Sequence, residues 1–221
     1  MKILGVKSLA IPAIKVVGFA RFRDERGYFT EPFRRSDIDQ TPETAFLVGS
    51  SFVQENESLS VAGTVRGMHF QWNPYMGKLV RTLHGHMVDM VLDIRKSSAT
   101  FGKAIMYDMP TDDSSDTNEW IWVPPGFAHG NFYPQTTRIE YLCSGEYNPG
   151  CEAGISPLAP DIDWSLCDPL LKRRFDALVE NGSIVSDKDR RGLSLQAWLS
   201  DPRSDNFVFG PTMSDPLEFG R

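Results

Sequence analysis

Short runs of branched and aromatic residues recur through the first two thirds of the chain, and glycine or proline separates them. In the segment at 88–94, VDMVLDI, apolar side chains alternate with Asp89, Val91 and Asp93, which is the period of a half-buried strand. Similar runs are KLVRTLH, EWIWV and RIEYLC. Many short strands at close spacing predict an all-β sandwich or barrel. The chain lacks the βαβ rhythm and the GxGxxG motif that would favour a Rossmann fold.

The composition changes after about residue 160. With 221 residues the chain fits one domain, and we expect residues 1–165 to form its β part. We expect residues 166–200 to be a helical insertion and return segment of the same domain. Its apolar residues recur at helical spacing before a stop signal at Asn181–Gly182, namely Leu166, Leu170, Leu171, Phe175, Leu178 and Val179. Residues 201–221 are expected to form an irregular tail, wrapped on the surface or partly disordered.

Charge and composition argue against several classes of function. A formal charge of −6 argues against a general nucleic-acid or anionic-membrane binder, and no apolar run approaches the ~18 residues that span a bilayer. The N-terminal run is interrupted by Lys7 and Lys15, so we interpret it as one or two strands and not as a signal peptide. The cysteines are odd in number and lack metal spacing, which indicates reduced thiols and a cytoplasmic protein: Cys143, Cys151 and Cys167.

The motif RGMHFQ at 66–71 places His69 inside an apolar strand, three residues after Arg66. Imidazole has an unperturbed pKa near ~6.5, so its free base is available at neutral pH. Arg66 and His69 have opposite parity on a strand. Both can therefore line one cavity only if the strand slips by one residue between them, and Gly67 is the natural place for such a β-bulge.

Several further segments, in the right order, resemble the dTDP-4-dehydrorhamnose 3,5-epimerase family. They are DERGYFTE (24–31), QEN (54–56), RGMHFQ (66–71), KLV (78–80), DIRKSSATFG (93–102), VPPGFAHG (123–130), EYLCSGEYNPGCEAGI (140–155) and IVSDKD (184–189). The resemblance implies a cupin-type jelly roll with a few short helices, mainly near the C-terminus. It also implies a homodimer that exchanges N-terminal strands, and it implies neither a metal nor an organic cofactor.

The family's reaction inverts carbons next to the C4 ketone of a nucleotide-linked 4-keto-6-deoxy sugar. It needs a base, a group that stabilises the enolate oxygen, and an acid on the opposite face. The resemblance implies His69 as the base, Asp189 as the carboxylate that orients it, and Lys78 as the enolate stabiliser. Tyr141 is implied as the acid, and its strand parity with Ile139 and Cys143 points it inward. The longer segment before residue 184 leaves Asp187 as a second candidate partner for His69.

The substrate-binding residues follow from the same resemblance. Arg26 and Arg66 are expected to hold a diphosphate, because guanidinium groups pair with phosphate oxygens. The remaining candidates for contacts to the base or sugar are Phe29, Glu31, Gln54, Asn56, His129, Tyr147, Glu152 and Lys188. Met76 occupies a position where many family members have glutamine. We expect a dTDP-linked sugar, while CDP- and GDP-linked sugars and inversion at C3, C5 or both stay open.

Two other functions compete with epimerisation. Metal-dependent cupins use a His-x-His pair, a following glutamate and a later histidine, which His84, His86 and His129 imitate. However, no glutamate follows at the expected distance, Asp89 faces away from both histidines on a strand, and Gly85 predicts a turn between them. A jelly roll that binds a sugar nucleotide without turnover is the third hypothesis, and the complete catalytic set argues against it.

Overall fold

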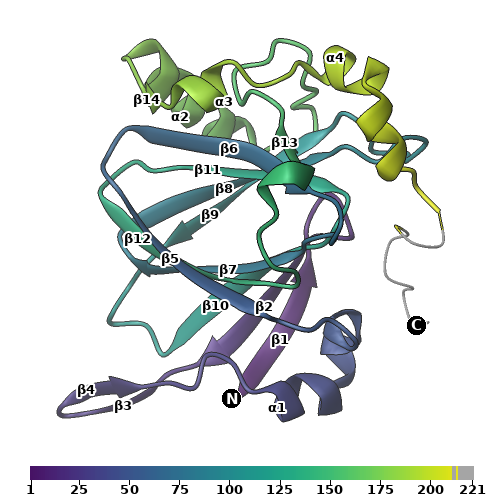
Figure 1. The fold of residues 1–221 in the computed structure, drawn as a ribbon. Coiled ribbons are helices and arrows are strands. Elements are labelled where there is room, and N and C mark those ends of the chain that lie inside the picture. Colours follow the sequence, from purple (N-terminus) through teal and green to yellow (C-terminus); the bar gives the residue numbers. More distant parts are fainter. Residues whose placement is uncertain (211–212, 214–221) are drawn as a thin grey trace.

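Two largely antiparallel sheets face each other in the computed structural model, which describes residues 1–210 and residue 213 (Figure 1). The first sheet has the strand order β1-β2-β10-β7-β12-β5, with the bounds Ile3–Ser8, Lys15–Ala20, Thr117–Val123, Lys78–His84, Thr137–Cys143 and Gln54–Ser60. The second has the order β13-β6-β11-β8-β9, with β14 beside β6, and the bounds Glu152–Gly154, Thr64–Gln71, Phe127–Phe132, His86–Asp93, Ala104–Pro110 and Ile184–Val185. The predicted all-β sandwich is confirmed.

The strand β8 differs from the half-buried strand that its alternation predicts. Both faces are buried, and the carboxylates of Asp89 and Asp93 are fully shielded from solvent. The side chains of Val88, Met90 and Leu92 pack under the C-terminal helices on the outer face of the sheet. The opposite face of β8 points between the two sheets. The alternation of charged and apolar residues was therefore misleading, because the charges of β8 are paired inside the protein.

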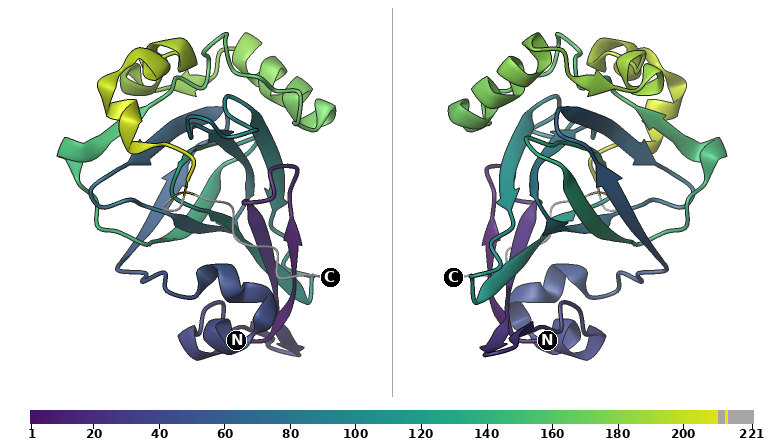
Figure 2. Two further views of the ribbon diagram at one scale, coloured as in Figure 1. Left: turned by 90° about the vertical axis from the view of Figure 1, so that its right-hand side faces the viewer. Right: turned by 90° about the vertical axis from the view of Figure 1, so that its left-hand side faces the viewer.

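Helices from the C-terminal third cover the outer face of the second sheet (Figures 1 and 2). They are α2 (Pro169–Glu180), α3 (Asp187–Arg190), α4 (Leu195–Ser200) and the 3₁₀ helix η3 (Pro202–Asn206). The helix α2 begins where the Asp168 side chain accepts a hydrogen bond from the Leu170 N–H, and it ends at Asn181 before Gly182. The predicted helix and its stop signal are confirmed. The spacing predicts Leu170 on the buried face of this helix, but its side chain is 49% exposed. Consecutive residues of a helix point in different directions, and it is the neighbouring Leu171 that packs in the core.

A smaller helical unit covers the outer face of the first sheet. The helix α1 (Arg35–Gln40) and the 3₁₀ helix η1 (Pro42–Leu47) bury Ile38 and Leu47 against Trp120 and Trp122. Before this unit, the hairpin of β3 (Phe22–Asp24) and β4 (Gly27–Phe29) projects away from the sandwich (Figure 1). The N-terminal run forms β1 and β2, as predicted. No helix in the described part of the chain is long and apolar enough to cross a membrane.

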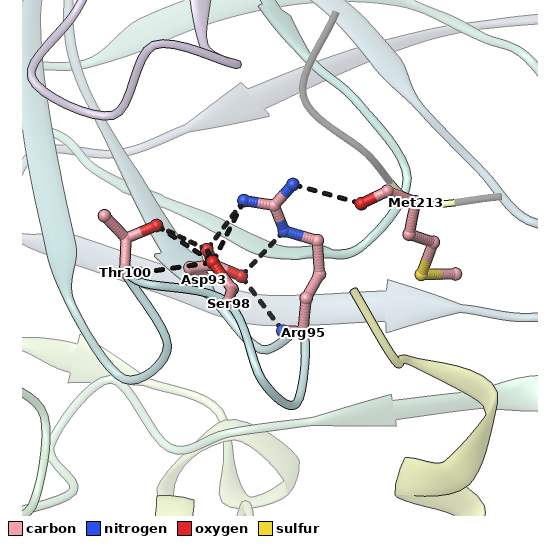
Figure 3. Close-up of polar contacts among 5 residues, drawn as sticks. All are labelled: Asp93, Arg95, Ser98, Thr100 and Met213. Carbon is pink, nitrogen blue, oxygen red and sulfur yellow. Dashed lines mark hydrogen bonds and ion pairs between the residues drawn. The ribbon is translucent and has the colours of Figure 1, made fainter. Parts of the chain in front are cut away.

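A buried ion pair closes the turn between β8 and β9. The Asp93 carboxylate accepts two hydrogen bonds from the Arg95 guanidinium, at 2.9 and 2.7 Å, and two more from the hydroxyls of Ser98 and Thr100 (Figure 3). The Arg95 side chain also donates to the carbonyl oxygen of Met213, at 3.3 Å. The Arg95 backbone N–H also donates to Asp93 Oδ1 at 2.9 Å. These five donors on one carboxylate compensate for the loss of water, which a buried charge requires.

The segment after residue 200 contributes to the core more than the predicted surface tail would. Phe207 is fully buried and Met213 is 4% exposed, and both belong to the apolar cluster under the helices. The predicted tail spans 201–221, and residues 211–212 and 214–221 lie outside the described residues. Phe207 explains why the segment does not lie only on the surface. The segment is polar and rich in proline, yet it inserts this one large apolar side chain into the core.

Candidate active site

A cavity of about 290 Å³ opens between the two sheets. A second lobe of about 160 Å³ lies next to it. The two share His69, Lys78, His129 and Tyr141 among their lining residues. The histidines come from β6 and β11 of the second sheet, and the lysine and tyrosine come from β7 and β12 of the first. Two pairs of polar side chains therefore occupy opposite walls of one cavity.

His69 is held by a carboxylate from the distant helix α3. Its Nε2 lies 2.7 Å from Asp189 Oδ1, and Asp189 Oδ2 accepts a hydrogen bond from the Gly67 N–H at 3.3 Å. Burial alone would raise the pKa of Asp189. The hydrogen bond and attraction of His69, with the Gly67 N–H, outweigh this effect, so the pKa lies below its ordinary value. Asp187, the other candidate partner, has a side chain that is 88% exposed.

The strand β6 contains the predicted bulge. Between Arg66 and His69, β6 has two residues where the neighbouring β11 has only Gly130. Gly67 adopts φ +111°, a value that side chains with a Cβ rarely allow. The one-residue slip brings Arg66 and His69 to line the same lobe of the cavity. The bulge at Gly67 is confirmed.

Gly67→Ala is expected to destabilise the protein and to displace His69. A Cβ at residue 67 would lie 2.5 Å from the Cα of Gly130 and 2.9 Å from the His129 carbonyl oxygen, and both are backbone atoms that cannot rotate away. With the strained φ, we expect a loss of roughly 2–4 kcal/mol in the free energy of unfolding. Urea denaturation measures it. The matched control is Gly63→Ala, because Gly63 has φ +82° but no described atom lies within 4 Å of the place that a Cβ would take there. Equal losses in the two variants would contradict the proposed backbone clash.

Lys78 and Tyr141 face His69 from the opposite sheet. The Lys78 Nζ lies 5.9 Å from the centre of the Tyr141 ring. Burial lowers the pKa of Lys78 from its ordinary value, although Cys143, Asp89 and Glu152 counteract this effect. Burial also raises the pKa of Tyr141. Tyr141 therefore stays protonated at neutral pH. Lys78 loses its proton more readily than a surface lysine does.

The mouth of the cavity has a cluster of polar side chains. The Tyr147 hydroxyl donates to Glu152 Oε1 at 2.9 Å, and the Lys188 ammonium pairs with the same carboxylate. Burial of Glu152 opposes ionisation, but these two donors outweigh it and lower the pKa below its ordinary value. On β5, Gln54 accepts from the Tyr147 N–H at 2.8 Å and donates to Asn56 at 3.1 Å. Five of the predicted binding residues thus lie together.

Three predicted binding residues lie outside the cavity of their own chain. Arg26 is on the projecting β3–β4 hairpin and pairs with Asp24 at 2.6 Å. Phe29 is 64% exposed on the same hairpin, and Glu31 pairs with Arg34. The hairpin leaves the sandwich directly after β2, and none of the three residues lines the cavity or its second lobe.

The three histidines of the metal hypothesis lie in separate environments. His86 pairs with Asp108, His129 pairs with Asp89, and His84 is exposed beside the turn at Gly85. Within residues 1–210 and 213, no group of three or more His, Cys, Asp or Glu side chains is arranged to hold a metal ion. The three histidines are therefore not arranged as the ligand set that the metal hypothesis requires.

The sequence model of the dTDP-4-dehydrorhamnose 3,5-epimerase family matches residues 8–197. The dTDP-4-dehydrorhamnose 3,5-epimerase of Shigella flexneri is 37% identical over 175 residues, which cover 76% of this chain and 91% of that protein. The chain belongs to the dTDP-4-dehydrorhamnose 3,5-epimerase family.

Solved structures support the fold of this epimerase. The dTDP-6-deoxy-D-glucose-3,5-epimerase of Legionella pneumophila, in complex with dTDP-4-keto-L-rhamnose, has a TM-score of 0.74 at 28% identity and covers 92% of this chain and 97% of that one. A 3′-monoepimerase of Streptomyces bikiniensis, in complex with dTDP-quinovose, has a TM-score of 0.67 at 26% identity and covers 86% and 87%. The predicted family and its all-β fold are confirmed.

Sequence reasoning missed two buried residues that shape the epimerase cavity. Asp89 lies behind His129, with 2.6 Å between its Oδ1 and the histidine Nε2, and it also accepts from Asn131 at 3.2 Å. Gln71 lines the cavity, and its side-chain amide donates hydrogen bonds to the carbonyl oxygens of Pro74 and Glu146, which lie in two different loops. A charged residue inside the apolar run of β8 was the available signal for Asp89. Gln71 gave no comparable signal, because its role depends on loops that meet only in three dimensions.

Proposed function

We propose that this chain epimerises a nucleotide-linked 4-keto-6-deoxy sugar, with conversion of dTDP-4-dehydro-6-deoxyglucose to dTDP-4-dehydrorhamnose as the main candidate reaction. The observation that carries the proposal is the placement of His69 and Tyr141 on opposite walls of one cavity, with Lys78 beside the tyrosine. Inversion of a carbon requires a proton to leave from one face and another to arrive at the opposite face. A sugar ring between the two sheets would meet one group on each face.

His69 is the proposed base. If its Nε2–H donates to the Asp189 carboxylate, the neutral ring carries its lone pair on Nδ1. That nitrogen takes the proton from the carbon next to the C4 ketone, and the electrons of the C–H bond move onto the ketone oxygen as an enolate. Asp189 stabilises the imidazolium that results, because its own pKa lies below the ordinary value and keeps it ionised.

Lys78 and Tyr141 are proposed to complete the reaction. The Lys78 ammonium stabilises the negative oxygen of the enolate by a charge-assisted hydrogen bond. The Tyr141 hydroxyl gives its proton to the carbon from the face opposite His69. The pair of electrons returns from the oxygen to the carbon, so the ketone is restored and no oxidant or reductant is required.

We propose that the remaining polar residues bind the nucleotide diphosphate. Arg66 lines the smaller lobe and donates to Ser60 at 2.9 Å, which leaves other guanidinium N–H groups for phosphate oxygens. The cluster at the cavity mouth would contact the sugar or the base, and it consists of Gln54, Asn56, Tyr147, Glu152 and Lys188. His129 lies beside His69 across β6 and β11, and is a further candidate contact.

We propose a homodimer in which the β3–β4 hairpin reaches the cavity of the second copy. Arg26, Phe29 and Glu31 would then contact substrate from outside the chain that holds it. The support is the exposure of three aromatic side chains on the projecting hairpin, Phe22, Tyr28 and Phe29. Light scattering would contradict the dimer if it gave the mass of one chain.

We also propose that the protein works in the cytoplasm, where its three free cysteines would stay reduced.

Proton NMR of dTDP-4-keto-6-deoxyglucose with the protein in D₂O tests the function. Loss of both the C3 and C5 proton signals is expected for a 3,5-epimerase, whereas loss of one signal would define a single-site enzyme. Persistence of both signals with folded protein would reject this substrate. The same experiment after dialysis against EDTA separates the metal hypothesis, because exchange that stops and then returns with added metal would favour a metal-dependent cupin.

A further inference from the structure

The C-terminal segment, defined here as residues 206–210 and Met213, packs behind one wall of the cavity. The family match ends at residue 197, so this segment lies outside it. The Phe207 ring lies 5.3 Å from the ring of Phe70 and 5.9 Å from that of Tyr75, and the Tyr75 hydroxyl donates to the Asn206 carbonyl at 2.8 Å. Phe70 lines the cavity, as does Met76, the neighbour of Tyr75.

A second contact joins the segment to the cavity through Arg95. The guanidinium carbon of Arg95 lies 4.3 Å from the ring centre of Phe127 and 5.0 Å from that of Phe209, so both rings contact one cation. Phe127 lines the cavity, whereas Phe209 belongs to the C-terminal segment. The Met213 carbonyl accepts a hydrogen bond from the same guanidinium (Figure 3).

Arg95 has little freedom to move between the two rings. Its guanidinium is fixed by two hydrogen bonds to the fully buried Asp93, and its side chain is 1% exposed. The backbone around it is also tied to the segment, because the Lys96 N–H donates to the Phe207 carbonyl at 2.7 Å and the Phe209 N–H donates to the Lys96 carbonyl at 2.8 Å. Phe209 is therefore one of the contacts that hold Arg95 in place against Phe127.

We infer that the C-terminal segment sets the shape of the substrate cavity, with Phe209 as a positioning residue that acts on Phe127 through Arg95. This inference rests on the proposed epimerase function for its kinetic test only. Phe209 does not line the cavity, so its effect should fall on the binding of substrate rather than on the proton transfers. Substrate binding depends on the wall that Phe127 forms, while the proton transfers depend on His69 and Tyr141.

The kinetic test compares Phe209→Ala with two matched variants. Phe209→Ala is expected to raise KM by roughly threefold to tenfold, with kcat within about twofold of the wild type, because a partly buried cation–π contact is lost. Phe209→Tyr keeps the aromatic face and is expected to restore KM. Val208→Ala is the control in the same segment, because Val208 is 45% exposed and should leave KM unchanged. A KM equal to the wild type in Phe209→Ala, or an equal rise in Val208→Ala, would overturn the inference.

Amide hydrogen exchange tests the same inference without substrate. In Phe209→Ala, peptides covering residues 123–128 are expected to exchange faster than in the wild type, while peptides of β1 and β2 are unchanged. Unchanged exchange at 123–128 would overturn the inference. If wild-type protein fails to turn over dTDP-4-keto-6-deoxyglucose, the proposed substrate fails, and the exchange result still decides whether the segment supports the cavity wall.

Discussion

Replacing His69 by alanine is expected to reduce the exchange of the substrate's α protons by roughly 10³-fold or more, because the imidazole is the proposed base at that face. The fold should survive. The His69 side chain is 32% exposed, and after its removal Asp189 still accepts the hydrogen bond of the Gly67 N–H. We therefore expect a loss below about 2 kcal/mol in the free energy of unfolding.

Proton NMR in D₂O measures the exchange rate, and circular dichroism during urea unfolding measures the stability. His84→Ala is the matched control, because His84 is exposed at the end of β7 and does not line the cavity. Wild-type exchange in His69→Ala would remove His69 as the base. A comparable loss of proton exchange in both variants would show that the effect is not specific to His69.

Tyr141→Phe is expected to separate loss of the proton from inversion of the carbon. The ring keeps its packing against the apolar cluster that includes Ile139, while the proposed proton donor on the second face is gone. His69 can still remove the α proton and return solvent deuterium to the same face, so exchange should remain measurable. Inversion should fall by roughly 10²-fold or more, which is the range for removal of one general acid.

Comparison of deuterium incorporation with product formation measures this separation in a single sample. Tyr107→Phe is the matched control: Tyr107 donates to Glu119 at 2.7 Å, outside the cavity, so its hydroxyl should not affect the reaction. An unimpaired rate of inversion in Tyr141→Phe would exclude Tyr141 as the acid. Loss of exchange together with inversion would instead indicate that the tyrosine is needed for substrate binding.

The fold could be predicted largely because strands of this size leave a periodic signal. The runs at β7, β10 and β12 fall where the sequence indicated, and the parity argument correctly required a bulge at Gly67. The burial of β8 could not be predicted in the same way. The carboxylates Asp89 and Asp93 are typical of a solvent-facing side of a strand, whereas each contacts a partner from another element or from the following turn.

The position of a candidate site residue could be predicted where the residue lies on a strand, and less so where it depends on the meeting of distant segments. His69, Lys78 and Tyr141 reach one cavity through regular strand geometry. The choice between Asp187 and Asp189 needed the position of α3, which the longer preceding segment obscured. The position of Arg26 depends on where a projecting hairpin lies, and a single chain does not determine that.

The partner of His69 lies 120 residues further along the chain. During synthesis, every described strand of the two sheets except β14 has left the ribosome well before α3 does. The sandwich can therefore begin to form while the imidazole still lacks its carboxylate, and the pair assembles only after α3 has been made. A nascent chain halted between residues 160 and 180 has not yet added Asp189, so the proposed base would gain its orienting carboxylate only after the strands of both sheets except β14 have been made.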